Sequence, residues 1–172
     1  MIRIIRLIKM RIIFFSLIVI LLSSSCKSAH NAYEISKKNK PYHSYTKADK
    51  IINYAKKFLG VKYKYGGTTR KGMDCSGLIQ TAYKSESIQL PRTTGNLVKT
   101  GSWIPIKNIK KGDLLFFATS KNSRKVNHVG IVTTITGTNV SFLHASSSKG
   151  VMISNLSQRY WYFAFVQARR VL

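Results

Sequence analysis

The chain has few cysteines. Of the two, Cys26 directly follows an apolar leader and Cys75 lies in the body of the sequence. If Cys26 belongs to an export signal, Cys75 has no partner for an internal disulfide. A single remaining thiol in an exported protein is typical of a reactive group. Cys75, His43, His128 and His144 show no paired metal-ligand spacing, so we expect no zinc and no other cofactor.

Acidic residues are also scarce. Five Asp and Glu stand against 29 Lys and Arg, which gives a formal net charge of +24. A field of this sign attracts polyanions. An exported protein rarely meets nucleic acid, so we expect no nucleic-acid partner. Anionic lipid headgroups, carboxylate-rich wall peptides and a merely solvated basic surface remain as explanations.

Residues 1–25 have the pattern of an export signal. Basic residues precede an apolar run, Ile12–Leu22, which has the length of a signal-peptide core and is short for a membrane span. Three serines then lead into Cys26, which predicts a bacterial lipoprotein signal with a lipidated Cys26, although Leu22 lies four residues before the cysteine rather than three. An ordinary signal peptide and an uncleaved anchor are alternatives. We expect a monomer anchored in the cell envelope, in the outer rather than the inner membrane.

Two helices are predicted in the first half of the remaining chain. After a flexible basic tether over residues 26–46, Thr46 and Asp49 form a capping box, and an apolar rhythm runs through Leu59 to a terminating Gly60. Asp74 is the predicted N-cap of a second helix that begins at Cys75. The positive end of that helix dipole should favour the thiolate form of Cys75.

The second half has the alternation of strands. Turn residues separate apolar segments that we expect to form an antiparallel meander. The predicted strands are residues 114–118, 126–134, 140–144, 151–155 and 163–171. Helices followed by strands indicate an α+β fold, with N-terminal helices packed on a central antiparallel sheet in one domain over residues 47–172.

The turn at residues 136–139 decides whether two histidines can meet. A two-residue turn at Gly137 and Thr138 places His144 opposite Ile131 and sends His128 to the other face. A three-residue loop instead places His144 opposite Gly130, with His128 as its diagonal neighbour on the same face. A catalytic arrangement therefore predicts an odd-length loop or a β-bulge here.

A thiol with two such histidines has the parts for nucleophilic attack on a carbonyl. His128 would take the proton of Cys75 and return it to the leaving amine, while His144 would orient the His128 ring. The backbone N–H of Cys75 and the hydroxyl of Tyr63 would stabilise the oxyanion. Taken singly, each of these residues is more often structural than catalytic.

Six segments in this order resemble the NlpC/P60 family of cell-wall cysteine peptidases, and in particular its murein endopeptidase lipoproteins. These segments are residues 63–67, 73–78, 90–93, 112–117, 128–131 and 144–146. The resemblance implies a papain-like α+β core and the same roles for Cys75, His128, His144 and Tyr63. It also implies that Asp74 and Ser76 help to receive the substrate peptide.

The same resemblance implies a substrate. The family cleaves peptide stems of peptidoglycan, at the bond between D-glutamate and the diamino acid or at the D,D cross-link, through a thioester. The carboxylates of such stems suit a basic cleft, where Arg70, Lys71 and Arg92 are candidate contacts. A catalytically silent wall-binding lipoprotein, and an amidase or acyltransferase that uses the same Cys–His pair, are the alternative functions.

Overall fold

The computed structural model describes residues 45–172, which form one compact unit. The predicted leader (residues 1–25), the lipidated Cys26 and most of the tether lie outside the described residues. Within the described part, no helix is both long and apolar enough to cross a membrane. The fold combines helices with an antiparallel β-sheet and confirms the predicted α+β class.

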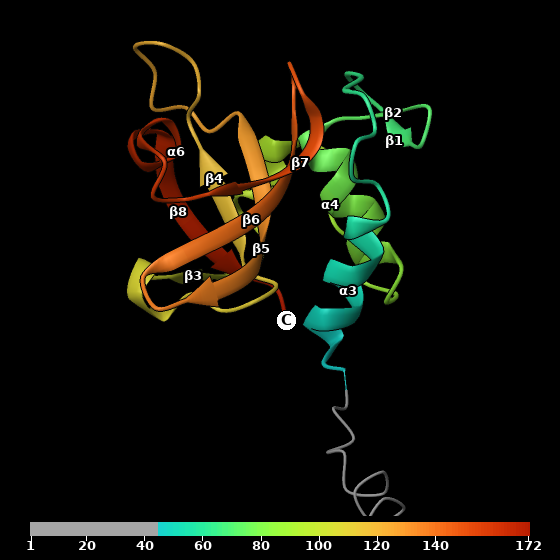
Figure 1. Ribbon diagram of the computed structural model, residues 1–172, viewed down its shortest axis with the longest axis horizontal. Coiled ribbons are helices and arrows are strands. Elements are labelled where there is room, and N and C mark those ends of the chain that lie inside the picture. The colour runs from blue at the N-terminus through green and yellow to red at the C-terminus, as the bar shows by residue number, and fades with distance from the viewer. Residues whose placement is uncertain (1–44) are drawn as a thin grey trace, which may run out of the picture. The chain divides into compact units, whose positions relative to one another are not determined.

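Two helices cover one face of the sheet. Helix α3 (Lys47–Lys56) begins with the predicted capping box between Thr46 and Asp49, and α4 (Cys75–Lys84) begins after the predicted N-cap, Asp74. Figure 1 shows the two helices side by side, with α4 between α3 and the sheet. Their apolar faces pack with inward residues of the sheet, such as Leu114, Phe116 and Ile131, in one buried cluster.

The C-terminal end of α3 differs from the prediction. The helix ends at Lys56, and a turn follows as far as Gly60, whose φ of +80° suits glycine. Because the turn breaks the helical rhythm, Leu59 does not join the buried face and is exposed. In the segment after Gly60, Tyr63 makes an isolated bridge with Met73, and a small hairpin follows, β1 (Thr68–Thr69) and β2 (Gly72–Met73).

The main sheet has six strands in the order β3-β8-β4-β5-β6-β7, all pairs antiparallel. The predicted meander is correct for β4 to β7. The strands are β3 (Ser102–Ile104), β4 (Leu114–Phe117), β5 (His128–Thr136), β6 (Asn139–Ser146), β7 (Gly150–Asn155) and β8 (Phe165–Arg170). The last strand, β8, lies between β3 and β4, so the order of the strands in the sheet differs there from their order in the sequence.

The predicted strand 163–171 is partly wrong. Its start belongs to helix α6 (Arg159–Ala164), and only β8 continues as a strand. Helix α6 lies toward the far side of the sheet from α3 and α4 (Figure 1). There its Ala164 and Trp161 join a second buried cluster with Leu115, Phe117 and Phe142. The remaining short helices are α5 (Thr94–Leu97) and a 3-10 turn, η1 (Ile106–Asn108).

The β5–β6 hairpin contains the predicted bulge. Thr136 pairs with Asn139 across a two-residue turn, and Thr134 pairs with Ser141. Thr133 is then the extra residue, since Val132 already pairs with Phe142. The bulge shifts the register by one residue, which brings His128 and His144 to the same face of the sheet.

Candidate active site

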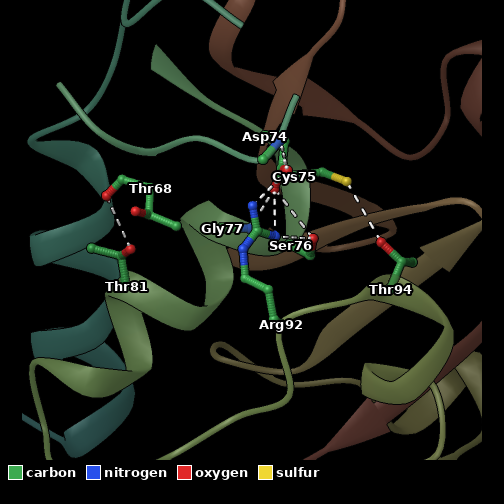
Figure 2. Close-up of polar contacts among 9 residues, drawn as sticks. Thr68, Asp74, Cys75, Ser76, Gly77, Thr81, Arg92 and Thr94 are labelled. Carbon is green, nitrogen blue, oxygen red and sulfur yellow. Dashed lines mark hydrogen bonds and ion pairs between the residues drawn. The ribbon is translucent and has the colours of Figure 1, made fainter. Parts of the chain in front are cut away.

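Cys75 is held at the first turn of α4. Asp74 caps the helix by accepting the backbone N–H of Gly77 at 2.7 Å. The Cys75 side chain is 7% exposed, and its Sγ lies 3.7 Å from the Oγ1 of Thr94, toward which it points in Figure 2. The thiol is therefore a nearly enclosed group with one polar neighbour from α5.

Burial raises the pKa of the Cys75 thiol. Hydrogen bonds from Thr94 and from the backbone N–H groups of Val129 and Ser76 lower it, but they only partly offset the loss of hydration. The shift is opposite to the predicted one, because the loss of hydration, with a smaller contribution from the negative charge of Asp74, outweighs these hydrogen bonds. The resting side chain is therefore a protonated thiol.

The two histidines lie in contact, as the bulge allows. The Nε2 of His128 is 3.0 Å from the Nδ1 of His144, and the Nε2 of His144 is 2.9 Å from the Oγ of Ser154. His144 and Ser154 are buried, and His128 is half-buried at the start of β5. Three side chains from three adjacent strands thus form one hydrogen-bonded chain that points at the cavity containing Cys75.

Aromatic rings surround this chain. The indole of Trp161 stacks on His128, with ring centroids 5.4 Å apart and 25° between the planes, and meets His144 edge-on at 4.6 Å. Phe117 and Phe142 pack beneath the indole with centroids 5.0 and 5.2 Å away. The rings pack against both imidazoles and so restrict the planes that these can adopt.

This enclosure keeps both imidazoles neutral. Burial lowers the pKa of His128 to about 4, and burial together with the neighbouring His128 lowers the pKa of His144 to about 3. At neutral pH His128 is therefore an unprotonated base. A neutral imidazole and a protonated thiol that line one cavity are the two groups that a proton transfer from sulfur to nitrogen would require.

Arg92 is already paired. Its guanidinium donates to both carboxylate oxygens of Asp74, at 3.0 and 2.7 Å, and to the Oγ of Ser76 at 2.8 Å. Figure 2 shows the guanidinium pointing at Asp74 and Ser76. Burial alone would raise the pKa of Asp74, but hydrogen bonds from Arg92, Gly77 and Gly66 hold it below its usual range. The three predicted binding residues thus form one locked unit.

Two cavities flank the thiol, and both are lined by Cys75, Tyr63 and Asn127. The first, which we call the histidine cavity, has a volume of about 470 Å³ and contains the two catalytic histidine candidates, the loop Ser146–Lys149 and Trp161. The second, the arginine cavity, measures about 370 Å³ and contains Asp74, Ser76, Arg92 and Thr94. Arg70 and Lys71 line neither cavity; Arg70 lies over the ring of Phe58.

Tyr63 lies between the two cavities and is half-buried. Burial raises the pKa of its hydroxyl, so this group stays protonated and can donate a hydrogen bond. Within residues 45–172, no three Cys, His, Asp or Glu side chains lie close enough together to hold a metal ion.

Of the candidates in the described part of the chain, the structure brings together Tyr63, Asp74, Cys75, Ser76, Arg92, His128 and His144, whereas Arg70 and Lys71 lie outside both cavities. Sequence reasoning missed Ser154 and Trp161. Their signals were weak: Ser154 is one of many serines, and Trp161 lies in a short helix whose Gln158 N-cap makes no side-chain capping hydrogen bond.

The chain belongs to the NlpC/P60 family, whose sequence model matches residues 60–170. It is 41% identical over 116 residues to the probable endopeptidase NlpC homolog of Haemophilus influenzae, covering 67% of this chain and 58% of that protein. It is 38% identical over 124 residues to the murein DD-endopeptidase MepS/murein LD-carboxypeptidase of Escherichia coli K12, covering 72% and 62%. The chain thus spans about 60% of the length of these relatives.

A solved structure supports the fold. The crystal structure of an NlpC/P60 family protein from Bacillus cereus superimposes with a TM-score of 0.66 at 34% identity, over 73% of this chain and 40% of that one. The predicted family and its α+β architecture are confirmed.

Proposed function

We propose that this protein is a peptidoglycan endopeptidase that hydrolyses amide bonds of wall stem peptides with Cys75 as nucleophile. One observation carries the proposal. The ring nitrogens of His128 and His144 lie 3.0 Å apart, and both residues line the cavity that Cys75 also lines. A merely structural thiol would not need a hydrogen-bonded imidazole pair facing it. The murein and endopeptidase names of the relatives support this substrate class.

The proton positions follow from the contacts. The Nε2 of His128 faces His144, which leaves Nδ1 to accept the Cys75 proton. Nδ1 must then be bare at rest, so His128 carries its proton on Nε2 and donates it to the Nδ1 of His144. His144 in turn carries its proton on Nε2 and donates it to Ser154. As the acceptor at the end of this chain, the Ser154 hydroxyl is compatible with this tautomer of both rings.

The reaction proceeds in two halves. As the thiol transfers its proton to His128, sulfur attacks the scissile carbonyl, and the new imidazolium protonates the leaving amine. A water, deprotonated by His128, then hydrolyses the thioester. The Tyr63 hydroxyl and the backbone N–H of Cys75 donate to the oxyanion, where charge develops.

The remaining predictions extend this function. Asp74, Ser76 and Arg92 would bind the acyl side of the peptide as one preformed polar unit. Lipidation of Cys26, after removal of residues 1–25, would anchor the domain through the tether over residues 26–46, in the outer rather than the inner membrane. We propose that the enzyme acts as a monomer on peptidoglycan.

Digestion of purified peptidoglycan by residues 27–172 tests the substrate class. Mass spectrometry of the soluble products should show muropeptides shortened at the D-glutamate–diamino acid bond or at the D,D cross-link. The masses identify the bond. A folded protein that binds peptidoglycan yet releases no fragment from several wall types would contradict the proposal and favour the silent wall-binding alternative.

The pH profile of kcat/KM should extend to unusual acidity. The neutral form of His128 is the active base, and its pKa lies at about 4 rather than 6.5. Activity should therefore persist at pH 5 and fall by half near pH 4. An acidic limb centred near pH 6.5 would show that the ring is not enclosed as described.

Folding must be followed in the same titration. In the unfolded chain His128 and His144 bind protons near pH 6.5, whereas in the folded chain they do so only near pH 4 and pH 3. The free energy of unfolding therefore decreases as the pH falls below 6.5. Circular dichroism at each pH gives the folded fraction by which the rate is corrected.

A further inference from the structure

The position of His128 fixes the direction in which a substrate lies, if the proposed function holds. The imidazole that protonates the leaving amine must reach its nitrogen, so the leaving group lies on the histidine side of Cys75. His128 lines the histidine cavity and not the arginine cavity. The leaving-group residue therefore occupies the histidine cavity, and the acyl residues occupy the arginine cavity.

The two cavities differ in charge. In the arginine cavity the guanidinium of Arg92 is neutralised by Asp74 at 2.7 Å. In the histidine cavity the imidazoles are neutral and the thiol is protonated, so Lys149 is the one ionised side chain among the lining residues. The leaving-group side is therefore cationic, whereas the acyl side is close to neutral.

Lys149 does not share in the ion pairs of the domain. Each of the four acidic residues in residues 45–172 lies within 4 Å of another basic side chain. These pairs are Lys50–Glu86, Arg92–Asp74, Lys111–Asp49 and Arg170–Asp113. No acidic side chain in the described part of the chain is thus left over to neutralise the charge at the histidine cavity.

The loop that carries Lys149 is well fixed. The backbone N–H of Lys149 donates to the Oγ of Ser146 at 3.3 Å, and the next residue, Gly150, has a φ of +74°. A Cβ on Gly150 would lie 2.3 Å from the carbonyl oxygen of Val61, so the loop packs tightly against the segment before Tyr63. Ser146, Ser147 and Ser148 also line the cavity, so three hydroxyl-bearing residues precede Lys149 in the same loop.

We propose that Lys149 and the serines of this loop bind a free carboxylate on the leaving-group residue of the substrate. A cation flanked by hydroxyl donors, in a cavity with no acidic side chain, is complementary to a carboxylate. The enzyme would then select a diamino acid that retains an ionised carboxylate over one, such as lysine, that lacks it, or over its amidated form. The inference rests on the proposed function, since it assigns a role to one side of that site.

Two synthetic stem peptides that differ only in a carboxylate or a carboxamide on the leaving-group residue provide the test. At low ionic strength the wild type should cleave the carboxylate peptide with kcat/KM about two- to fivefold higher, which is the scale of a solvent-accessible charge pair. Lys149→Met should abolish that preference by slowing the carboxylate peptide alone, and Lys149→Arg should retain it. Added salt should weaken the preference in the wild type.

Lys84→Met is the matched control. Lys84 is exposed at the opposite end of α4 from Cys75, so its loss removes the same net charge without touching the cavity. The control should cleave both peptides as the wild type does. An undiminished carboxylate preference in Lys149→Met would overturn the inference, as would an equal loss of preference in Lys84→Met.

Failure of the proposed function gives a different result. In that case neither peptide is cleaved in a Cys75-dependent manner, whatever residue stands at position 149. Fluorescence anisotropy of the labelled peptides on Cys75→Ala then still tests the subsite through binding. A carboxylate preference that Lys149→Met removes supports the site, and equal affinities reject it.

Discussion

Replacing His128 by glutamine should lower kcat/KM about 1,000-fold, the middle of the range for loss of a general base. Glutamine keeps a planar polar group of similar size beneath Trp161, but it cannot take the proton of Cys75. Because burial raises the pKa of that thiol, the reaction depends on a base more strongly than it would with a preformed thiolate. Steady-state kinetics on a defined muropeptide measure the loss.

His144→Gln is the graded comparison for this prediction. His144 contacts His128 and Ser154 and orients the base without touching the thiol proton, so its loss should cost less, about 10- to 100-fold. Both variants should unfold as cooperatively as the wild type. A His128→Gln enzyme as active as His144→Gln would contradict the assignment of His128 as the base.

Gly130→Ala should reduce activity at least tenfold and lower the free energy of unfolding by about 1–3 kcal/mol, as overpacking does in a filled core. A Cβ at this position would lie 2.6 Å from Cδ2 of Phe142 and 3.3 Å from Cβ of His144. Phe142 is fully buried against Phe117 and Trp161, so its ring cannot swing away. The strain therefore passes to the rings that hold His144. Urea unfolding and kcat measure the two effects.

Gly95→Ala is the matched glycine control. Gly95 lies in α5, next to Thr94, and a Cβ there meets no atom within 4 Å. The substitution should leave activity unchanged and stability equal or slightly higher, since alanine suits a helix better than glycine. If Gly130→Ala were as harmless as Gly95→Ala, the close packing of β5 on β6 at the site would be wrong.

Much of the candidate site could be predicted because local rules determine it. The N-cap at Asp74 fixes the start of α4 and so the place of Cys75, and the face of His144 follows from strand alternation once a bulge is required. The sequence could not say which form the shift would take. In the structure the shift comes from a β-bulge in which Thr133 is the extra residue, and the turn keeps two residues.

What could not be predicted depends on contacts between distant segments. Trp161 reaches His128 only because α6 packs on the second buried cluster and β8 inserts between β3 and β4. The sign of the Cys75 pKa shift depends on the depth of the thiol, which no local motif reports. The pairing of Arg92 with Asp74 likewise removes a cation that, in the sequence, looked free to meet a substrate carboxylate.

The role of Cys75 is tested most directly by comparing the rate of fragment release from one peptidoglycan preparation by the wild type and by Cys75→Ala, at equal concentrations of folded protein. If Cys75 is the nucleophile, the alanine variant should retain less than about one part in a thousand of the wild-type rate while unfolding as cooperatively as the wild type. Fragment release by Cys75→Ala at a rate comparable to the wild type would contradict it, because the bond would then be broken without the thiol.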